Sequence, residues 1–191
     1  MPGRVANVRP GYIVGPLDTS RRWAFWPARV REGGEMVIPG TPDDLVQFID
    51  VRDPADWIVH LIDTNTTGIF NATGPEEDLT MHGMVEGCRD GAKASTSFTW
   101  VDPAFLKQKG VSDGAFPIWA PMDADGAIHQ CNITKAVKAG LTFRTVAETA
   151  RATLEWYDTL PAQLQREMVS PARLTPEKEK EILEEWKARK Q

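Results

Sequence analysis

One stretch of the chain is predicted to form a strand, a helix and a second strand in direct succession, and this order constrains the fold most. Residues 45–51 and 66–73 are both apolar and β-prone. Between them, Asp53 is placed as a helix N-cap and Pro54 suits the first helical turn. The apolar stripe of this helix consists of Trp57, Ile58, Leu61 and Ile62. Such a succession is typical of βαβ units and predicts an α/β fold.

A short β-prone segment, residues 4–10, lies almost at the start of the sequence. The glycines and prolines of residues 11–16 follow it and predict a loop. Parallel strands in α/β folds are normally flanked by other elements. No strand or helix precedes this segment in the sequence, so we expect its neighbours to come from elsewhere.

Further predicted strands and helices alternate along the rest of the sequence. Trp23, Trp26 and Val30 recur at helical spacing within residues 20–31, and Gly33-Gly34 marks the end of this helix. The remaining predicted elements are strands at residues 35–38 and 97–101, helices at 80–88, 132–138, 146–160 and 175–190, and a loop with aromatic anchors at 110–131.

Composition narrows the classes of function. The chain has 27 acidic and 22 basic side chains and a formal net charge of −5, which disfavours nucleic acid as a partner, since nucleic-acid binders usually carry a basic surplus. No apolar run reaches the length of a membrane helix, and no signal-peptide pattern follows Met1. We therefore expect a cytoplasmic protein without a membrane partner, in which Cys88 and Cys131 are free thiols.

The sequence contains no self-sufficient catalytic arrangement. His60, His82 and His129 lie on separate predicted elements without zinc-site spacing, so surface or structural roles are expected for them. No glycine-rich phosphate loop is present. The two tyrosines, Tyr12 and Tyr157, are each followed four residues later by a proline, so neither forms a Tyr-x-x-x-Lys pair. We predict no catalytic residue and no metal site within this chain.

Three segments stand in a distinctive order and spacing. They are residues 8–18 (Val-Arg-Pro-Gly-Tyr-Ile-Val-Gly-Pro-Leu-Asp), residues 47–53 (Gln-Phe-Ile-Asp-Val-Arg-Asp), which lead into a helix with Trp57, and residues 68–74 (Gly-Ile-Phe-Asn-Ala-Thr-Gly). Together they resemble the NAD-dependent epimerase/dehydratase family of extended short-chain dehydrogenases/reductases. The resemblance covers essentially the whole chain, which looks like the carboxyl-terminal half of such a protein.

The resemblance implies the fold and the cofactor. The expected fold is α/β, the carboxyl-terminal part of a Rossmann-like short-chain dehydrogenase/reductase with a small mixed α/β substrate-binding domain, and residues 1–191 are expected to form a single unit. In this family the amino-terminal half supplies the glycine-rich loop and the Tyr-x-x-x-Lys pair, both absent here. NAD or NADP would therefore bind only with the missing half, and this chain is expected to be inactive alone.

The resemblance also assigns cofactor-binding residues. The loop after the first strand runs past the nicotinamide ring in relatives, so Pro10, Gly11 and Ile13 are the candidates for cofactor contact. A glycine at the carboxyl end of a strand permits close approach of a ligand, although the same residue also serves a simple turn. Tyr12 is expected to face the substrate.

Three more substrate-binding candidates come from the same comparison. Arg22 and Trp26 lie where relatives begin their substrate domain, and an arginine there would grip a phosphate or carboxylate unless it belongs to a solvated face. Gln47 is the third candidate, next to Val46, which stands where sugar-nucleotide epimerases carry an arginine for substrate phosphates. This departure weakens the expectation of a nucleotide-sugar substrate.

Two functions follow from this pattern. The first is the substrate-binding half of an NAD(P)-dependent reductase or epimerase-like oxidoreductase that acts on a carbonyl or alcohol carbon. The second is a non-catalytic binding or interaction module, a regulatory or RNA-binding relative that retains part of the fold. The expected partners are a small-molecule substrate and either an amino-terminal Rossmann half or further copies of the chain. Because uncovered strand edges promote association, we expect the isolated chain to self-associate or to be poorly soluble.

Overall fold

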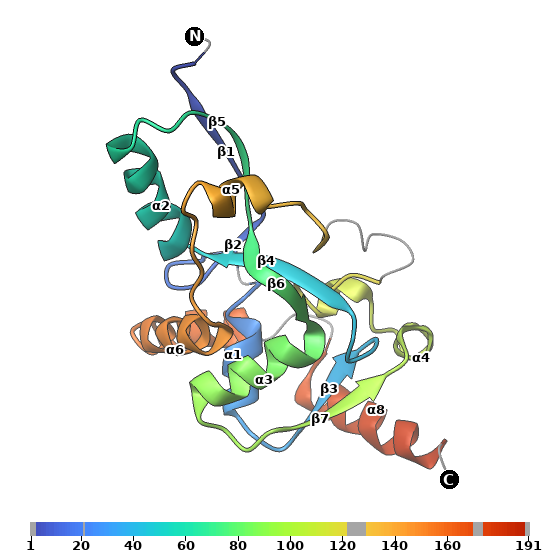
Figure 1. Ribbon diagram of the computed structural model, residues 1–191. Coiled ribbons are helices and arrows are strands. Elements are labelled where there is room, and N and C mark those ends of the chain that lie inside the picture. Colours follow the sequence, from blue (N-terminus) through green and yellow to red (C-terminus); the bar gives the residue numbers. More distant parts are fainter. Residues whose placement is uncertain (1–2, 21, 122–128, 170–173, 190–191) are drawn as a thin grey trace.

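The computed structural model describes residues 3–20, 22–121, 129–169 and 174–189 (Figure 1). The strands within these ranges form three small sheets. The strands are β1 (Ala6–Pro10), β2 (Tyr12–Val14), β3 (Glu35–Pro39), β4 (Leu45–Asp50), β5 (Gly68–Ala72), β6 (Gly74–Thr80) and β7 (Ser97–Val101). The helices are α1 (Phe25–Arg31), α2 (Arg52–Asp63), α3 (Met81–Ala92), α4 (Pro103–Gln108), α5 (Thr134–Lys138), α6 (Val146–Tyr157), α7 (Ala162–Val169) and α8 (Pro176–Ala188), with a short 3-10 turn, η1 (Asp113–Ala115).

Parallel pairing dominates the three sheets. β1 pairs with β5, with Val8 opposite Phe70, and β3 pairs with β7. In the third sheet β4 lies in the centre, parallel to β2 and antiparallel to β6. Helices connect these strands, as the succession β4, α2, β5 shows. The α/β class predicted from the sequence is therefore confirmed.

The helices pack on several sides of the sheets. α1, α3 and α6 lie together in Figure 1 and contact one another, whereas α2 and α5 lie beside the β1–β5 pair. α8 packs against β3, near the other end of the molecule (Figure 1). None of the helices in the described ranges is long and apolar enough to span a membrane.

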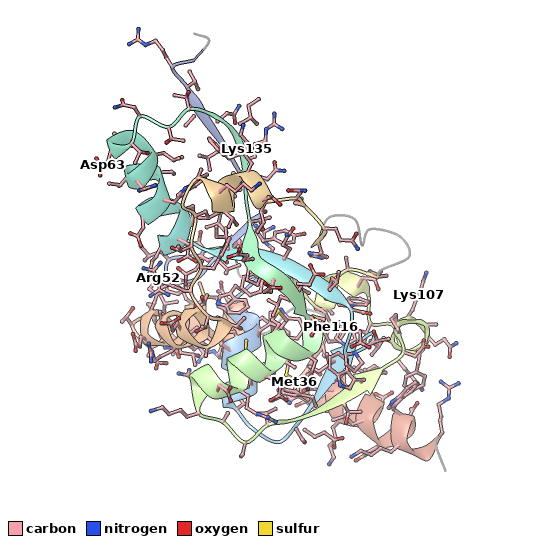
Figure 2. The ribbon with its side chains drawn as sticks, in the orientation of Figure 1. Met36, Arg52, Asp63, Lys107, Phe116 and Lys135 are labelled. Carbon is pink, nitrogen blue, oxygen red and sulfur yellow. The ribbon has the colours of Figure 1, made fainter. Side chains whose placement is uncertain are left out.

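Among the described residues, the interior consists of one large apolar cluster and two smaller ones. The large cluster joins α1, β3 and α3 to the segment around Phe116, and Figure 2 shows Met36 and Phe116 inside it. Cys88 lies fully buried in the same cluster. A second cluster lies between α2, β5 and α5, and includes Trp57 and Phe70. These clusters fix the positions of the strands that carry the site described below.

The first predicted loop and the helix after it are both shorter than predicted. Residues 11–16 contain strand β2, because the backbone of Tyr12–Val14 pairs with Phe48–Asp50 on β4. The helix expected over residues 20–31 begins only at Phe25, which places Pro27 in its first turn, where a proline is tolerated.

Helix α2 differs from the prediction in its cap and its stripe. Its N-cap is Val51, which makes no side-chain capping bond, so Asp53 is not the cap. Trp57 and Leu61 are buried as expected. Ile58 and Ile62 are exposed, because no described element covers that side of the helix.

Other elements also test the sequence predictions. Thr80 caps α3 as predicted, by accepting a hydrogen bond from Gly83 N, although the helix extends beyond residue 88 to Ala92. β6 was not predicted, because Gly-Pro-Glu-Glu-Asp has little strand propensity and its pairing with β4 determines its structure. Part of the predicted loop 110–131 lies outside the described residues.

Candidate functional site

The structure brings three predicted substrate-binding residues together around His129. The guanidinium carbon of Arg22 lies 4.9 Å from the centre of the Tyr12 ring, on its face. The Tyr12 and His129 rings are tilted at 45° with their centres 6.1 Å apart. Gln47 N donates a hydrogen bond to His129 Nδ1 over 3.2 Å. Arg22, Tyr12, His129 and Gln47 thus form one continuous group, which we call the candidate site.

A cavity of about 460 Å³ opens beside this group. One side is formed by β4 and β6, where residues 75–78 bulge away from the register between the two strands. This bulge carries three consecutive carboxylates, Glu76, Glu77 and Asp78. The opposite side runs from His129 to Thr134. The cavity therefore lies next to the candidate site and has an acidic lining.

Gln47 holds the far side of the cavity in position. Its side-chain nitrogen donates to the Cys131 carbonyl over 3.1 Å, and its side-chain oxygen accepts from Cys131 N over 3.0 Å. Asn71, from β5, donates to the carbonyl of Asn132 over 3.0 Å. Both polar atoms of the Gln47 side chain are thus engaged in hydrogen bonds to Cys131 within the protein. We call residues 129–132, which these bonds hold, the wall segment.

The candidate cofactor residues lie where β1 ends and in the short strand that follows, with Pro10 and Gly11 at the carboxyl end of β1 and Ile13 in the middle of β2. Pro10 and Gly11 are exposed there, and Ile13 is 40% exposed. A Cβ added to Gly11 would lie 2.5 Å from Thr73 Oγ1, closer than real Cβ contacts. Gly11 is therefore needed for packing against Thr73, independently of any ligand.

This edge fits one part of a nicotinamide dinucleotide. Ligands of α/β sheets bind beyond the carboxyl ends of strands, and the apolar surface of Pro10 and Ile13 suits the face of a nicotinamide ring. A pyrophosphate group needs a cluster of backbone N–H groups such as a glycine-rich loop provides, and the sequence has none. The residues present would contact the nicotinamide end only.

Trp26 lies in the core, away from the candidate site. Its side chain has no exposed surface, and its indole N–H donates to the Pro117 carbonyl over 2.7 Å. Arg29, on the same helix, donates to Glu179 and to the carbonyls of Gly33 and Glu35. Arg21, on the preceding segment, lies outside the described residues.

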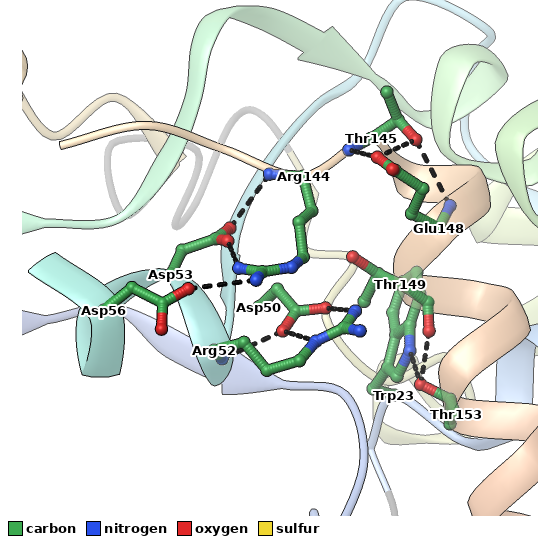
Figure 3. A network of polar contacts seen from close by, with 10 residues as sticks. All are labelled: Trp23, Asp50, Arg52, Asp53, Asp56, Arg144, Thr145, Glu148, Thr149 and Thr153. Atoms are coloured by element: carbon green, nitrogen blue, oxygen red, sulfur yellow. Dashed lines mark hydrogen bonds and ion pairs between the residues drawn. The ribbon is translucent and has the colours of Figure 1, made fainter.

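A second polar network ties the start of α2 to the start of α6 (Figure 3). Asp53 accepts hydrogen bonds from Arg144 N and from the Arg144 guanidinium, which also binds Asp56. Burial raises the pKa of Asp53, and the hydrogen bonds from Arg144 offset part of this effect. Asp53 thus joins two segments about ninety residues apart in the sequence, a contact that local sequence patterns do not reveal.

Asp50 and Arg52 extend this network at the end of β4. The Asp50 side chain is buried and accepts bonds from Arg52 N, Nε and Nη2. Burial opposes ionisation of Asp50, but the hydrogen bonds from Arg52 and Thr149, together with the Arg52 charge, outweigh it, so the pKa of Asp50 is lowered. The carboxylate therefore stays charged and fixes the turn between β4 and α2.

Asp53→Asn is expected to lower the free energy of unfolding by about 2 kcal/mol, because charge-assisted hydrogen bonds to a partly buried arginine are lost. Asp56→Asn is the matched control, since Asp56 binds the same guanidinium but its side chain is 72% exposed. Its expected cost is below about 0.5 kcal/mol. Urea unfolding of both variants measures the difference, and equal losses would show that Asp53 has no special role.

The described side chains offer no complete catalytic pair. Tyr157 donates to the Gln165 carbonyl over 2.9 Å, and burial raises its pKa, which disfavours a phenolate. His129 is buried, and burial lowers its pKa. Within the described ranges no group of three or more acidic, histidine or cysteine side chains is arranged to hold a metal ion. The sequence analysis did not assign His129 to the site, because a lone histidine carries no spacing signal.

No protein-family model and no curated protein matches this chain. Solved structures do match it. The Bordetella bronchiseptica enzyme WbmH in complex with NAD+ is 15% identical with a TM-score of 0.53, over 80% of this chain and 45% of that one. RMD from Pseudomonas aeruginosa, complexed with NADPH, is 15% identical with a TM-score of 0.51, over 82% and 48%. Thermus thermophilus UDP-glucose 4-epimerase complexed with NAD is 16% identical with a TM-score of 0.50, over 81% and 46%.

This chain spans less than half the length of each of these matched structures. At such low identity the likeness concerns the fold alone. It confirms that the chain has the fold of part of a Rossmann-like α/β enzyme, as the sequence resemblance implied.

Proposed function

We propose that this chain is the substrate-binding half of an NAD(P)-dependent oxidoreductase of the epimerase or reductase type, which acts on a carbonyl or alcohol carbon and is inactive alone. The cofactor, when bound, supplies hydride transfer at its nicotinamide ring. The matched structures were solved with NAD or NADPH, and this chain has the fold of part of them.

The open surface of the β1–β5 pair carries this proposal. β1 pairs with β5 along one edge and with no described strand along the other. One face packs on α2, where the Phe70 and Trp57 rings meet edge to face at 5.3 Å. Val5 and Ile69, on the other face, are more than half exposed. Because parallel sheets are normally covered on both faces, this surface fits a dinucleotide-binding half that adds a strand beside β1 and helices over Ile69.

The chain's own residues would then complete the ligand site from one side. Pro10, at the carboxyl end of β1, and Ile13, on β2, would contact the nicotinamide end. Arg22 and Tyr12 present a guanidinium stacked on a phenol to the same region, and this pair would orient a polar substrate. The proton-transfer groups would come from the other half, since this chain has no Tyr-x-x-x-Lys pair.

Calorimetry with NAD(H) and NADP(H) tests the proposal. We expect no binding to the chain alone, and binding after it is mixed with the protein segment encoded immediately upstream. Ile69→Asp should abolish binding in the mixture, because it places a charge on the apolar contact face. Leu164→Asp, at an exposed position on α7, is the matched control and should have no effect.

The contrary outcomes are equally specific. Absence of binding in the mixture would favour the second candidate function, a non-catalytic binding module. This candidate is retained because the described residues contain no catalytic pair. A monodisperse monomer that melts cooperatively, in light scattering and calorimetry, would also count against an uncovered half-protein, because the exposed β1 edge is expected to self-associate.

A further inference from the structure

The wall segment is attached to β4 and β5 through side chains. His129 accepts from Gln47 N, the Gln47 side chain binds Cys131 N and O, and Asn71 binds the Asn132 carbonyl. In the part of the chain that the structure describes, no backbone-to-backbone hydrogen bond joins this segment to either strand. Side-chain contacts therefore attach the described part of this segment to the two strands, and the imidazole is the group among these contacts that titrates near neutral pH.

The bond between Gln47 and His129 requires a neutral imidazole. Nδ1 accepts the Gln47 N–H, so this nitrogen carries no proton. A proton on Nδ1 would face the Gln47 N–H and remove the acceptor. The side chain is only 4% exposed, and burial lowers the pKa of His129, an effect that the nearby Ile118 backbone only partly offsets.

The groups around the imidazole come from three directions. The Tyr12 ring lies on the β2 side of the imidazole, and the Arg22 guanidinium lies over the Tyr12 ring. Glu76, Glu77 and Asp78 lie across the cavity on β6. Cys131 lies on the wall segment itself. Within residues 3–20, 22–121, 129–169 and 174–189, no carboxylate makes an ion pair with the His129 ring, and the causes of its pKa shift include no charged partner.

We propose that His129 is a pH-sensitive attachment, whose protonation releases the wall segment from β4 and opens that side of the cavity. The neutral form keeps the segment closed on Gln47. Because the pKa of His129 is lower in the attached state, the attachment is fully present above about pH 6.5, the ordinary value, and weakens as the pH falls below it. This inference concerns the cavity alone and does not depend on the proposed oxidoreductase role.

Hydrogen exchange at the Cys131 amide, in the full chain, tests the proposal. This N–H is bonded to the Gln47 side chain and reports attachment of the wall segment. From about pH 8 to about pH 5, after correction for intrinsic exchange, its protection is expected to be constant at first and then to fall by up to about tenfold per pH unit. In His129→Gln the protection should not change with pH, since the amide oxygen accepts a bond but does not titrate.

His82→Gln is the matched control, because His82 is exposed on α3 and should leave the wild-type profile unchanged. The wild-type chain also provides a test without any variant, since an NMR titration of the His129 ring gives its own midpoint. The fall in Cys131 protection should follow that midpoint, while the amide of Val85 in α3 stays protected. A flat wild-type profile, a midpoint unrelated to His129, or loss of the pH dependence in His82→Gln would overturn the proposal.

Discussion

Trp26→Ala is expected to lower the free energy of unfolding by about 3–5 kcal/mol, as large-to-small changes of buried aromatic residues do. The side chain is fully buried, and its ring lies 5.2 Å from that of Phe25 and 6.5 Å from that of Phe116, measured between centres. Removal leaves a cavity in the main cluster and also leaves the Pro117 carbonyl without its indole donor. Urea unfolding followed by circular dichroism measures the loss.

Trp26→Phe separates the two contributions. It keeps an aromatic ring in the core and removes the hydrogen bond to Pro117, so a smaller loss of about 1–3 kcal/mol is expected. If Trp26 instead contacts a substrate, as the family resemblance implied, the alanine variant should unfold normally and lose ligand affinity. An unchanged unfolding free energy would therefore favour the substrate role over the core role.

The sequence predicts local features well, whereas the environment of Trp26 could not be predicted from it. The strand, helix, strand order from β4 to β5 was predicted because apolar periodicity and turn residues are local signals. The cap of α3 by Thr80 is local too. In contrast, helical spacing places Trp26 on the apolar face of α1 but does not say whether that face meets a core or a ligand.

The features that the sequence did not predict depend on distant partners. Asp53 precedes Pro54 and so matches a cap in the sequence, yet it lies inside α2 and binds Arg144, because the chain returns to α2 at that point. The wall segment likewise depends on Gln47, whose partners are about eighty residues away. Of the predicted substrate residues, Tyr12, Arg22 and Gln47 do lie near one another, but only the structure shows that His129 connects them.

The open β1–β5 surface and the candidate site are physically connected. β1 ends at Pro10 and β2 starts at Tyr12, so a protein segment that covers the free edge of β1 would also face the proposed cofactor contacts, Pro10 and Ile13. Adding a half-protein there would bury Ile69 and enclose Ile13 in the same step. Under the proposed function, stability and ligand binding should therefore be coupled, since a ligand that binds only the assembled form stabilises that form.

Glu179→Ala is expected to lower the free energy of unfolding by about 3–5 kcal/mol, the usual cost of removing one partner of a buried ion pair. Glu179 is buried on α8, and its carboxylate accepts two bonds from Arg29, at 2.8 and 3.0 Å, and one from Val37 N at 2.9 Å. Its loss leaves the Arg29 charge and the Val37 N–H without this partner. The sequence predicts this helix at residues 175–190, and Glu179 occupies the same helical stripe as Ile182, Leu183 and Trp186.

Glu184→Ala is the matched control on the same helix. Glu184 is exposed, and its pair with Lys180 spans 3.9 Å between exposed side chains, so its removal should cost less than about 0.5 kcal/mol. Glu179→Gln should give an intermediate loss, because its amide oxygen still accepts the Val37 N–H while the charge beside Arg29 disappears. Equal stability of the two alanine variants would mean that the Arg29–Glu179 pair contributes nothing to the contact between α8 and β3.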